Sequence, residues 1–370
     1  MTNMKWFDKL KLQRLDLYII AKFLGTYFFA IALIIAIIVV FDYNEHIDKF
    51  ATSNAPFSAI VFDYYLNLIP YYANTFSALF VFISVIYFTS KLAETSEIIA
   101  MFAAGVSYRR MLRPYMVSAA LIALMTYGLS AYVIPMGNKT RIAFEVKYKR
   151  KKTTETARNI QLQVDNNTVA YMERYENRSN TGYRFSLDKF EDKKLVAHMT
   201  ARTITYHPEE RYKWTAKNWT IRELANDKEI IRSNKTVPLD TIIKIEPTDF
   251  LVSEGQQETM TSPQLSEYID KQKARGIANI KPFEIEYHKR IAMSFAAFIL
   301  TVIGASLSSK KTKGGMGLSL GIGLGLSFSY ILFQAISSAF AEQMPVYLAV
   351  WLPNIVYAFI AVYLYNKAPR

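Results

Sequence analysis

Uncharged, mostly apolar segments lie near both ends of the chain, whereas its middle is polar. Six of these segments lack Asp, Glu, Lys and Arg: residues 23–41, 64–90, 114–138, 291–309, 314–341 and 343–366. Each has at least 19 residues. Because a helix rises about 1.5 Å per residue, each is long enough to cross the hydrocarbon core of a bilayer. The pattern predicts a polytopic membrane protein with six transmembrane helices and excludes a soluble globular protein.

The polar segment between the third and fourth apolar runs alternates with a period of two. Its alternating apolar residues include Ile160, Leu162, Val164, Tyr183, Phe185 and Leu187. Period-two segments separated by turns are typical of a β-sandwich or jellyroll. We therefore expect an N-terminal part with an interfacial helix and three transmembrane helices (1–138). A β-jellyroll-like domain follows (139–287), and three further transmembrane helices end the chain (288–370).

Basic residues mark one side of the predicted membrane. They flank the first run, the loop after the second run, the loop after the fourth run and the end of the last run: Lys5, Lys9, Lys11, Arg14, Lys22, Lys91, Arg109, Arg110, Arg113, Lys310, Lys311, Lys313, Lys367 and Arg370. The positive-inside rule places both termini in the cytoplasm and residues 139–287 on the opposite side. We therefore attribute the net charge of +13 to membrane topology and to contact with anionic lipid, rather than to nucleic-acid binding.

No residue pattern predicts catalysis. The chain has no cysteine, which removes thiolate zinc sites and cysteine nucleophiles, and it has no G-x-x-x-x-G-K-[ST] loop for ATP. Residues 317–321 match the G-x-S-x-G nucleophile elbow, but no histidine follows His288. Gly317, Gly321 and Gly325 instead have the four-residue spacing that lets membrane helices pack closely. We expect no catalytic residue, metal ion or cofactor.

A short amphipathic helix is expected at about residues 94–105, between the second and third runs. Thr95 or Ser96 is suited to cap its start, and Gly105 to end it. Its apolar ridge has no partner within the loop and consists of Ile98, Ile99, Met101 and Phe102. Two interpretations are open: the helix lies on the membrane surface, or it docks into a cytoplasmic partner.

Residues 96–105 follow the pattern S-E-hydrophobic-hydrophobic-x-M-x-x-x-G, which resembles the coupling helix of the lipopolysaccharide-export permeases, the LptF/LptG family. Five further strings resemble segments of that family in the matching order: 15–19, 133–138, 201–214, 286–290 and 345–354. The last of them is more similar to LptG than to LptF. The resemblance extends over nearly the whole chain and over the layout of three spans, a β domain and three spans.

The resemblance implies a noncatalytic permease subunit of an ABC transporter in the inner membrane of Gram-negative bacteria. Such permeases work in pairs with a cytoplasmic ATPase dimer and have no enzymatic activity of their own. They take lipopolysaccharide from the inner membrane and pass it to a periplasmic β-jellyroll bridge toward the outer membrane.

Carried over onto this sequence, the resemblance implies roles for three groups of residues. Glu94 and Glu97 would face the ATPase. The docked surface would consist of Ile98, Met101 and Phe102, with Gly105 ending the helix. Spans one and five would form a lateral gate for lipid. Close helix packing at Gly317, Gly321 and Gly325 would set how readily that gate opens.

Basic residues also gather where the third span meets the polar domain, at Lys139, Arg141 and Lys147, and Lys49 lies near the outer end of the first span. A solvated hinge is one interpretation. The other is a site for the phosphates of an anionic lipid, which the family's lipid-contacting basic residues support. Some family members carry a lysine deeper in the first span, where this chain has Val39 and Val40.

Two other function classes were compared with the permease interpretation. A mechanotransmitting or scaffold protein that uses an ATPase without moving lipid also needs the docking helix, but it needs neither a headgroup cluster nor a gate. An intramembrane or periplasmic enzyme needs a titratable cluster in a pocket, and the sequence contains no such pattern.

Overall fold

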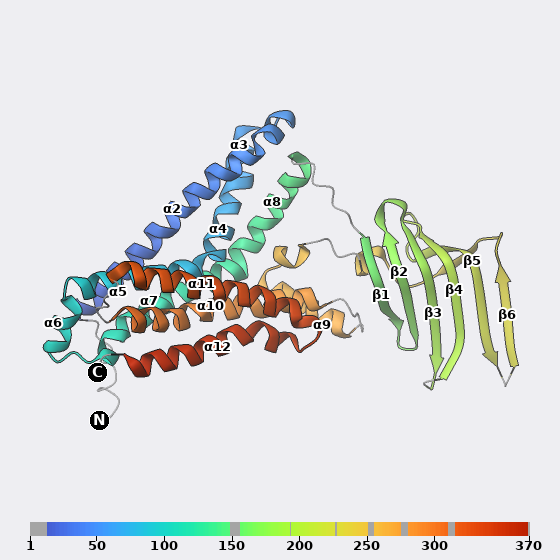
Figure 1. Cartoon of the computed structure of the whole chain (residues 1–370). Coiled ribbons are helices and arrows are strands. Elements are labelled where there is room, and N and C mark those ends of the chain that lie inside the picture. The colour runs from blue at the N-terminus through green and yellow to red at the C-terminus, as the bar shows by residue number, and fades with distance from the viewer. Residues whose placement is uncertain are drawn as a thin grey trace, which may run out of the picture. The chain divides into compact units, whose positions relative to one another are not determined.

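The computed structural model describes residues 13–148, 156–192, 194–225, 228–250, 255–274, 280–309 and 315–368. They belong to two compact units, one formed by Met1–Arg150 with Ile285–Arg370 and the other by Lys151–Glu284. The first is helical and the second contains a β-sheet (Figure 1). We call them the helical unit and the sheet unit. Part of the predicted interfacial helix falls on residues 1–12, which lie outside the described residues.

Six helices within the described ranges are long and apolar enough to cross a membrane, which confirms the prediction of six spans. These helices are Arg14–Thr52 (α2), Ser77–Glu94 (α5), Tyr108–Tyr148 (α7 continued by α8), Lys281–Ser308 (α10), Met316–Ala339 (in α11, Gly315–Ala339) and Val346–Asn366 (in α12, Val346–Lys367). Shorter segments complete the helical unit: α3 (Phe57–Ala59), the π-helical η1 (Ile60–Tyr65), α4 (Leu66–Thr75), α6 (Glu97–Ala103) and the π-helical η2 (Leu129–Val133), which joins α7 (Tyr108–Gly128) to α8 (Ile134–Tyr148).

Aromatic stacking and a glycine contact hold α5 in the middle of the helical unit. On one side, the Phe88 ring lies 5.5 Å from Phe23 of α2 and 5.1 Å from Tyr115 of α7, measured between centroids. On the other side, a Cβ at Gly323 of α11 would lie 2.2 Å from Cδ1 of Ile86. A larger residue would force the end of the Ile86 side chain to move, so α11 approaches α5 closely at Gly323.

The spans differ widely in how much apolar surface they leave uncovered. In α5, 78 % of the apolar stretch is buried, whereas only 17 % is buried in α2 and 22 % in α11. The two poorly covered helices expose large side chains such as Phe28, Phe29, Phe328 and Leu332. The chain therefore leaves its first and fifth spans open to lipid or to another protein.

The sheet unit contains one antiparallel sheet with the strand order β1-β2-β3-β4-β5-β6, so each strand pairs with the next one in the sequence (Figure 1). The strands are β1 (Thr156–Asp165), β2 (Thr168–Glu176), β3 (Thr181–Glu191), β4 (Lys194–Tyr206), β5 (Lys213–Ala225), β6 (Lys228–Asn234) and β7 (Leu239–Ile242). Both β6 and β7 pair with β5, at Trp219–Ala225 and Lys213–Ala216 respectively, and together they form one edge. The prediction of an inserted β domain is confirmed, and its strand order is that of a meander.

A row of irregular pairing crosses this sheet. Asn159 in β1, Arg184 in β3 and Asn218 in β5 have positive φ angles of 50°, 51° and 50°. In the β1–β2, β2–β3, β3–β4 and β4–β5 pairs these residues have no partner in the ladder, although the register is the same on both sides of the gap. The buried positions therefore step by three residues, as from Gly182 to Phe185. The expected alternation of Tyr183 with Phe185 on one face is wrong, because Arg184 between them has a positive φ and the buried positions are Gly182 and Phe185.

The core of the sheet unit lies on one face of the sheet and includes residues that follow β7. The indole N–H of the buried Trp214 donates to the carbonyl oxygen of Ile245 at 3.0 Å. The ring of Tyr175 lies 4.9 Å from that of Phe250. Helix α9 (Ser262–Ala274) follows, and its Tyr268 packs on Phe283 with 4.5 Å between ring centroids.

Candidate functional site

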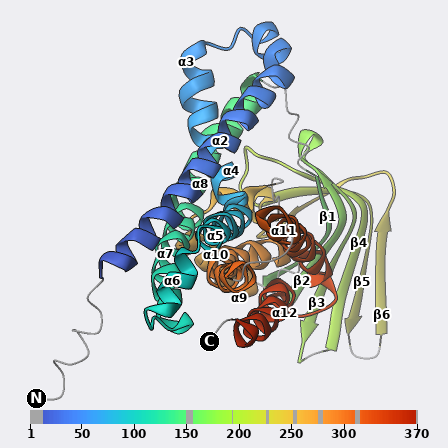
Figure 2. The ribbon, with the colours of Figure 1, turned by 60° about the vertical axis from the view of Figure 1, so that its left-hand side comes forward.

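Helix α6 lies at one end of the helical unit, between the end of α5 and the start of α7 (Figures 1 and 2). After it, Gly105 has a φ of +85°, and its N–H donates to the carbonyl of Phe102 at 3.0 Å. The N–H of Val106 donates to the carbonyl of Met101, also at 3.0 Å. This is a Schellman motif, which ends a helix sharply and requires a left-handed residue. The role predicted for Gly105 as the helix terminator is confirmed.

The predicted apolar ridge of α6 is divided between two surfaces. Ile98 is only 1 % exposed and belongs to the core formed with α2, α5 and α7, and Phe102 packs against the same core. The expectation that the ridge lacks a partner of its own is therefore wrong for Ile98. Ile99 is 54 % exposed, and Glu94, Ala100 and Ala103 are exposed beside it. A partner reaching α6 would meet this second surface.

Glu97, the first residue of α6, has neighbours on two sides. The hydroxyl of Tyr18 in α2 donates to its Oε2 at 3.0 Å, and the hydroxyl of Thr95 donates to its Oε1 at 3.1 Å. Ser96 occupies the N-cap position with a φ of 63°, and its side chain makes no capping bond. The predicted ATPase-facing carboxylate thus already connects α6 to the first span.

The start of α7 contains two residues that bond to distant helices. Arg110 donates to both carboxylate oxygens of Asp16 in α2, from Nη1 to Oδ1 at 2.5 Å and from Nη2 to Oδ2 at 2.7 Å. Tyr108 hydrogen-bonds with Ser306 of α10 at 2.9 Å, and its ring lies 5.7 Å from Tyr365 of α12. None of these pairings was predicted, because no sequence pattern relates residues so far apart.

The predicted headgroup residues lie near the opposite end of the helical unit and differ in their surroundings. Lys49, Lys139 and Lys147 are exposed, and the ammonium of Lys147 lies 4.9 Å from the ring centre of Tyr148. Arg141 is engaged within the chain. It donates to Oδ1 of the buried Asn138 and to Oε1 of the buried Glu145, both at 3.2 Å, and it lies over the ring of Tyr71 at 5.3 Å.

A second polar group fixes α2 at this opposite end. Asp42 accepts hydrogen bonds from the hydroxyls of Tyr64 and Tyr65 at 3.0 and 3.1 Å. Both tyrosines belong to η1, and π-helical turns often accompany positions where a helix must redirect its side chains. The contact ties the C-terminal part of α2 to η1.

The three glycines predicted to pack at a gate face open space within this chain. A Cβ at Gly317, Gly321 or Gly325 would meet no other heavy atom within 4 Å. The close contact of α11 is instead made by Gly323, which the spacing argument did not select. Close packing at the spaced glycines would therefore need a partner other than the residues that the structure describes.

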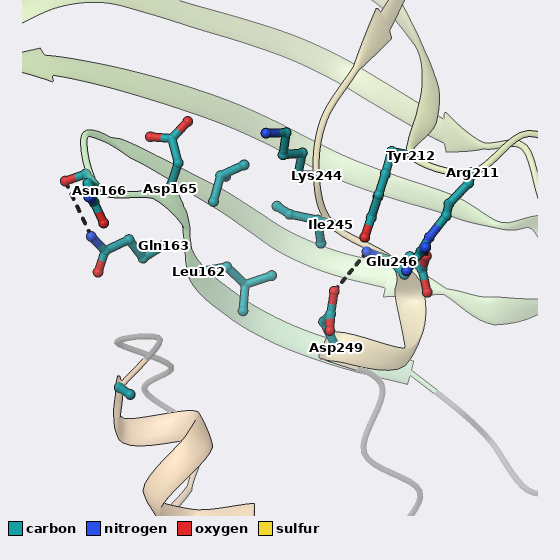
Figure 3. A pocket seen from close by; sticks show the side chains of 12 residues that line it. Leu162, Gln163, Asp165, Asn166, Arg211, Tyr212, Lys244, Ile245, Glu246 and Asp249 are labelled. Atoms are coloured by element: carbon teal, nitrogen blue, oxygen red, sulfur yellow. Dashed lines mark hydrogen bonds and ion pairs between the residues drawn. The ribbon is translucent and has the colours of Figure 1, made fainter.

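The sheet unit contains a polar cavity of about 340 Å³ beside the turn that joins β1 to β2 (Figure 3). Arg211 donates to Glu246 at 2.8 Å, and the N–H of Glu246 donates to Asp249 at 2.9 Å. The pKa of Asp165 is held below its usual range, and the largest cause is the hydrogen bond that its carboxylate accepts from the backbone N–H of Asn167. None of the predicted site residues lines this cavity. In the described part of the chain, no group of three His, Asp or Glu side chains is arranged to hold a metal ion.

Six apolar helices, a sheet inserted between the third and the fourth, and a short helix between the second and third are the features of a multi-pass membrane protein with an inserted β domain. The family model of the lipopolysaccharide export system permease LptF/LptG matches residues 17–367. The chain belongs to this family, which confirms the family resemblance found in the sequence, and the family is one of permeases and not of enzymes. No curated protein matches the chain.

Proposed function

We propose that this protein is the permease subunit of an ABC transporter that extracts lipopolysaccharide from the inner membrane and passes it to a periplasmic bridge. The match to the permease family over residues 17–367 carries the proposal. The chain supplies no ATPase of its own in this scheme, so a cytoplasmic ATPase dimer and a second permease complete the transporter. The similarity of residues 345–354 supports an LptG-like role.

The proposed orientation places α6 and both termini in the cytoplasm and the sheet unit in the periplasm. The basic residues of the described helix ends support it. Arg14 starts α2, Lys91 lies in the last turn of α5, Arg109 and Arg110 follow α6, and Lys367 lies in the last turn of α12. All of these ends lie near α6, as the positive-inside rule requires (Figure 1). Lys310, Lys311 and Lys313 lie outside the described residues.

In this proposal, α6 is the coupling helix and its exposed side receives the ATPase. Glu94, Ile99 and Ala103 supply the docking surface, with Glu97 at its edge, because these residues are reachable while Ile98 is not. An exposed isoleucine surrounded by alanines and flanked by two carboxylates suits a pocket with an apolar floor and a basic rim.

Lipid would enter beside α2 and α11, the two spans with the least buried apolar stretches. Gly317, Gly321 and Gly325 present a smooth open face on α11, which permits close approach of a helix from the second permease. Lys49, Lys139 and Lys147 are exposed at the end where phosphates of a lipid headgroup would lie.

The sheet unit would act as the jellyroll-like module that meets the periplasmic bridge. Its β6–β7 edge supports this, since Ile230 and Ile231 of β6 and Ile242 of β7 are 51 %, 58 % and 78 % exposed. An open edge with exposed apolar side chains is suited to pairing with a strand of another sheet.

The test is purification of the tagged full-length chain from its native host in a gentle detergent, with mass spectrometry of the bound proteins and lipids. An ABC ATPase, a second six-span permease and a lipid A-containing glycolipid are the expected companions. Ile99→Arg should remove the ATPase while the second permease stays. Leu195→Arg is the matched control, because Leu195 is 38 % exposed in the sheet unit. ATPase recovery without glycolipid would favour mechanotransmission, and recovery of neither would overturn the proposal.

A further inference from the structure

Two side-chain contacts link the region around α6 to the first turns of α2. Asp16 and Arg110 are 94 positions apart, and Tyr18 and Glu97 are 79 positions apart. Asp16 is only 3 % exposed, and the Arg110 side chain is 26 % exposed. A bidentate guanidinium–carboxylate pair fixes orientation as well as distance. Since the carboxylate is buried, losing Arg110 would leave a buried charge without its ion-pair partner.

The segment that joins α6 to Arg110 has little conformational freedom. The Schellman motif fixes Gly105 and Val106 on the end of α6. Ser107 then caps α7, with its hydroxyl accepting from the N–H of Arg110 at 3.3 Å and its carbonyl accepting from the same N–H at 2.9 Å. Every residue from the end of α6 to Arg110 therefore belongs to a helix end or a cap. A displacement of α6 must carry Arg110 with it.

Helix α2 is the span that such a displacement would move most readily. Only 17 % of its apolar stretch is buried, so between its first turns and the Asp42 contact with η1 few contacts oppose a tilt. Its packing face is narrow and consists of Ile19, Phe23, Tyr27 and Ile31, next to Asp16. Holding the inner end of α2 therefore goes far toward setting the position of the whole helix.

We propose that the Asp16–Arg110 pair is the connection through which α6 positions α2, and that the Tyr18–Glu97 hydrogen bond is its releasable companion. The inference rests on the proposed function, in which α6 receives the ATPase and α2 borders the lipid entry. The two contacts differ in kind. The ion pair is buried and bidentate, whereas the Tyr18–Glu97 bond is exposed, so a basic side chain of the docking ATPase would compete with Tyr18 for Glu97.

Asp16 also caps α2, because its Oδ2 accepts from the backbone N–H of Gln13 at 2.8 Å. Asp16→Asn separates the two roles, since an asparagine side chain still offers an oxygen to that N–H but carries no charge for Arg110. Arg110→Lys keeps a charge beside the buried carboxylate and removes the bidentate geometry. The second variant protects the experiment against a loss of folding in the first.

The experiment uses the transporter with its ATPase and second permease in lipid nanodiscs loaded with lipopolysaccharide. Because the chain has no cysteine, labels on Ala104→Cys at the end of α6 and Phe29→Cys in α2 can report the distance between the two helices. Both residues are exposed, and neither belongs to the proposed docking surface. ATP hydrolysis, lipopolysaccharide release and the label-to-label distance are measured with and without ATP.

In the otherwise unchanged transporter, the distance distribution should stay narrow, and the label on α2 should follow α6 when ATP binds. Asp16→Asn and Arg110→Lys should broaden that distribution and lower lipopolysaccharide release at least tenfold, while ATP hydrolysis stays within twofold. A narrow distribution in both variants, or an equal loss of hydrolysis and release, would overturn the inference. Absence of release in the unchanged transporter would instead count against the proposed function, and the distance measurement would still decide the inference.

Discussion

The two ends of the helical unit satisfy their polar side chains in different ways. At the end with α6, the bonds of Glu97, Arg110 and Tyr108 reach partners 79, 94 and 198 positions away. At the opposite end, Arg141 bonds to residues three and four positions away, Asp42 bonds to tyrosines 22 and 23 positions away, and three lysines stay exposed. Bonds between distant helices make those helices move together, whereas the exposed lysines are available for a ligand. The first end therefore suits force transmission and the second suits binding.

The largest effect on stability is expected at Tyr108, the most buried of the three residues at the α6 end that bond to distant helices. Tyr108 is 5 % exposed and contacts both α10 and α12. Tyr108→Ala should cost about 3–5 kcal/mol of stability, because truncating a buried aromatic ring leaves a cavity. Tyr108→Phe should cost only about 1 kcal/mol, the value of one hydrogen bond. Thermal unfolding of the detergent-purified chain measures both.

Tyr347→Ala is the matched control at the start of α12, where the side chain is 54 % exposed. Its effect should stay within about 0.5 kcal/mol. Equal melting temperatures for Tyr108→Ala and Tyr347→Ala would show that the α6 end is not held by this residue.

Two glycines of α11 that lie two positions apart have different surroundings. Gly323 contacts Ile86 of α5, whereas Gly321 faces open space. Gly323→Val should destabilise the chain by about 1–3 kcal/mol, because the new side chain would overlap Ile86. Gly321→Val meets open space, so the isolated chain should unfold at an unchanged temperature. If α11 packs on the second permease, Gly321→Val should instead reduce recovery of that permease. Equal destabilisation by the two variants would contradict the assignment of the two faces.

The membrane spans were predictable because a run of about 19 uncharged residues has few other stable states. The inserted sheet was predictable from period-two alternation, but the row of missing ladder partners was not. Arg184 has a positive φ and no ladder partner in β2 or β4, and no sequence pattern signals either feature, so Tyr183 falls on the opposite face from the one expected.

The limits of the site prediction have two physical causes. Amphipathicity located α6, yet it cannot tell whether an apolar residue faces a partner or the chain's own core, and Ile98 proved to face the core. The Asp16–Arg110 pair leaves no periodic signal, because each partner is a single charge in a segment where basic residues are common. Likewise, charge alone grouped Arg141 with the lysines, although its guanidinium is already bound within the chain.

The smallest effects are expected at the opposite end, and they should separate Arg141 from the lysines. Arg141→Gln removes the charge partner of the buried Glu145 and should cost about 1–3 kcal/mol of stability. Lys139→Gln with Lys147→Gln should change stability by less than about 0.5 kcal/mol, since both side chains are exposed. Thermal unfolding in the same detergent compares the two variants directly.

The lysine variant should act on lipid rather than on folding. Each basic residue near a membrane surface adds about 1 kcal/mol of attraction to anionic headgroups, so the double variant should weaken binding of a lipid A probe by roughly tenfold or more at low salt. Raising the ionic strength should reduce this difference, because exposed charges are screened over about 10 Å at 0.1 M salt. A neutral phosphatidylcholine probe should bind both proteins equally. If the lysine variant still binds lipid A but Arg141→Gln does not, then Arg141, and not the exposed lysines, recognises the headgroup at this end.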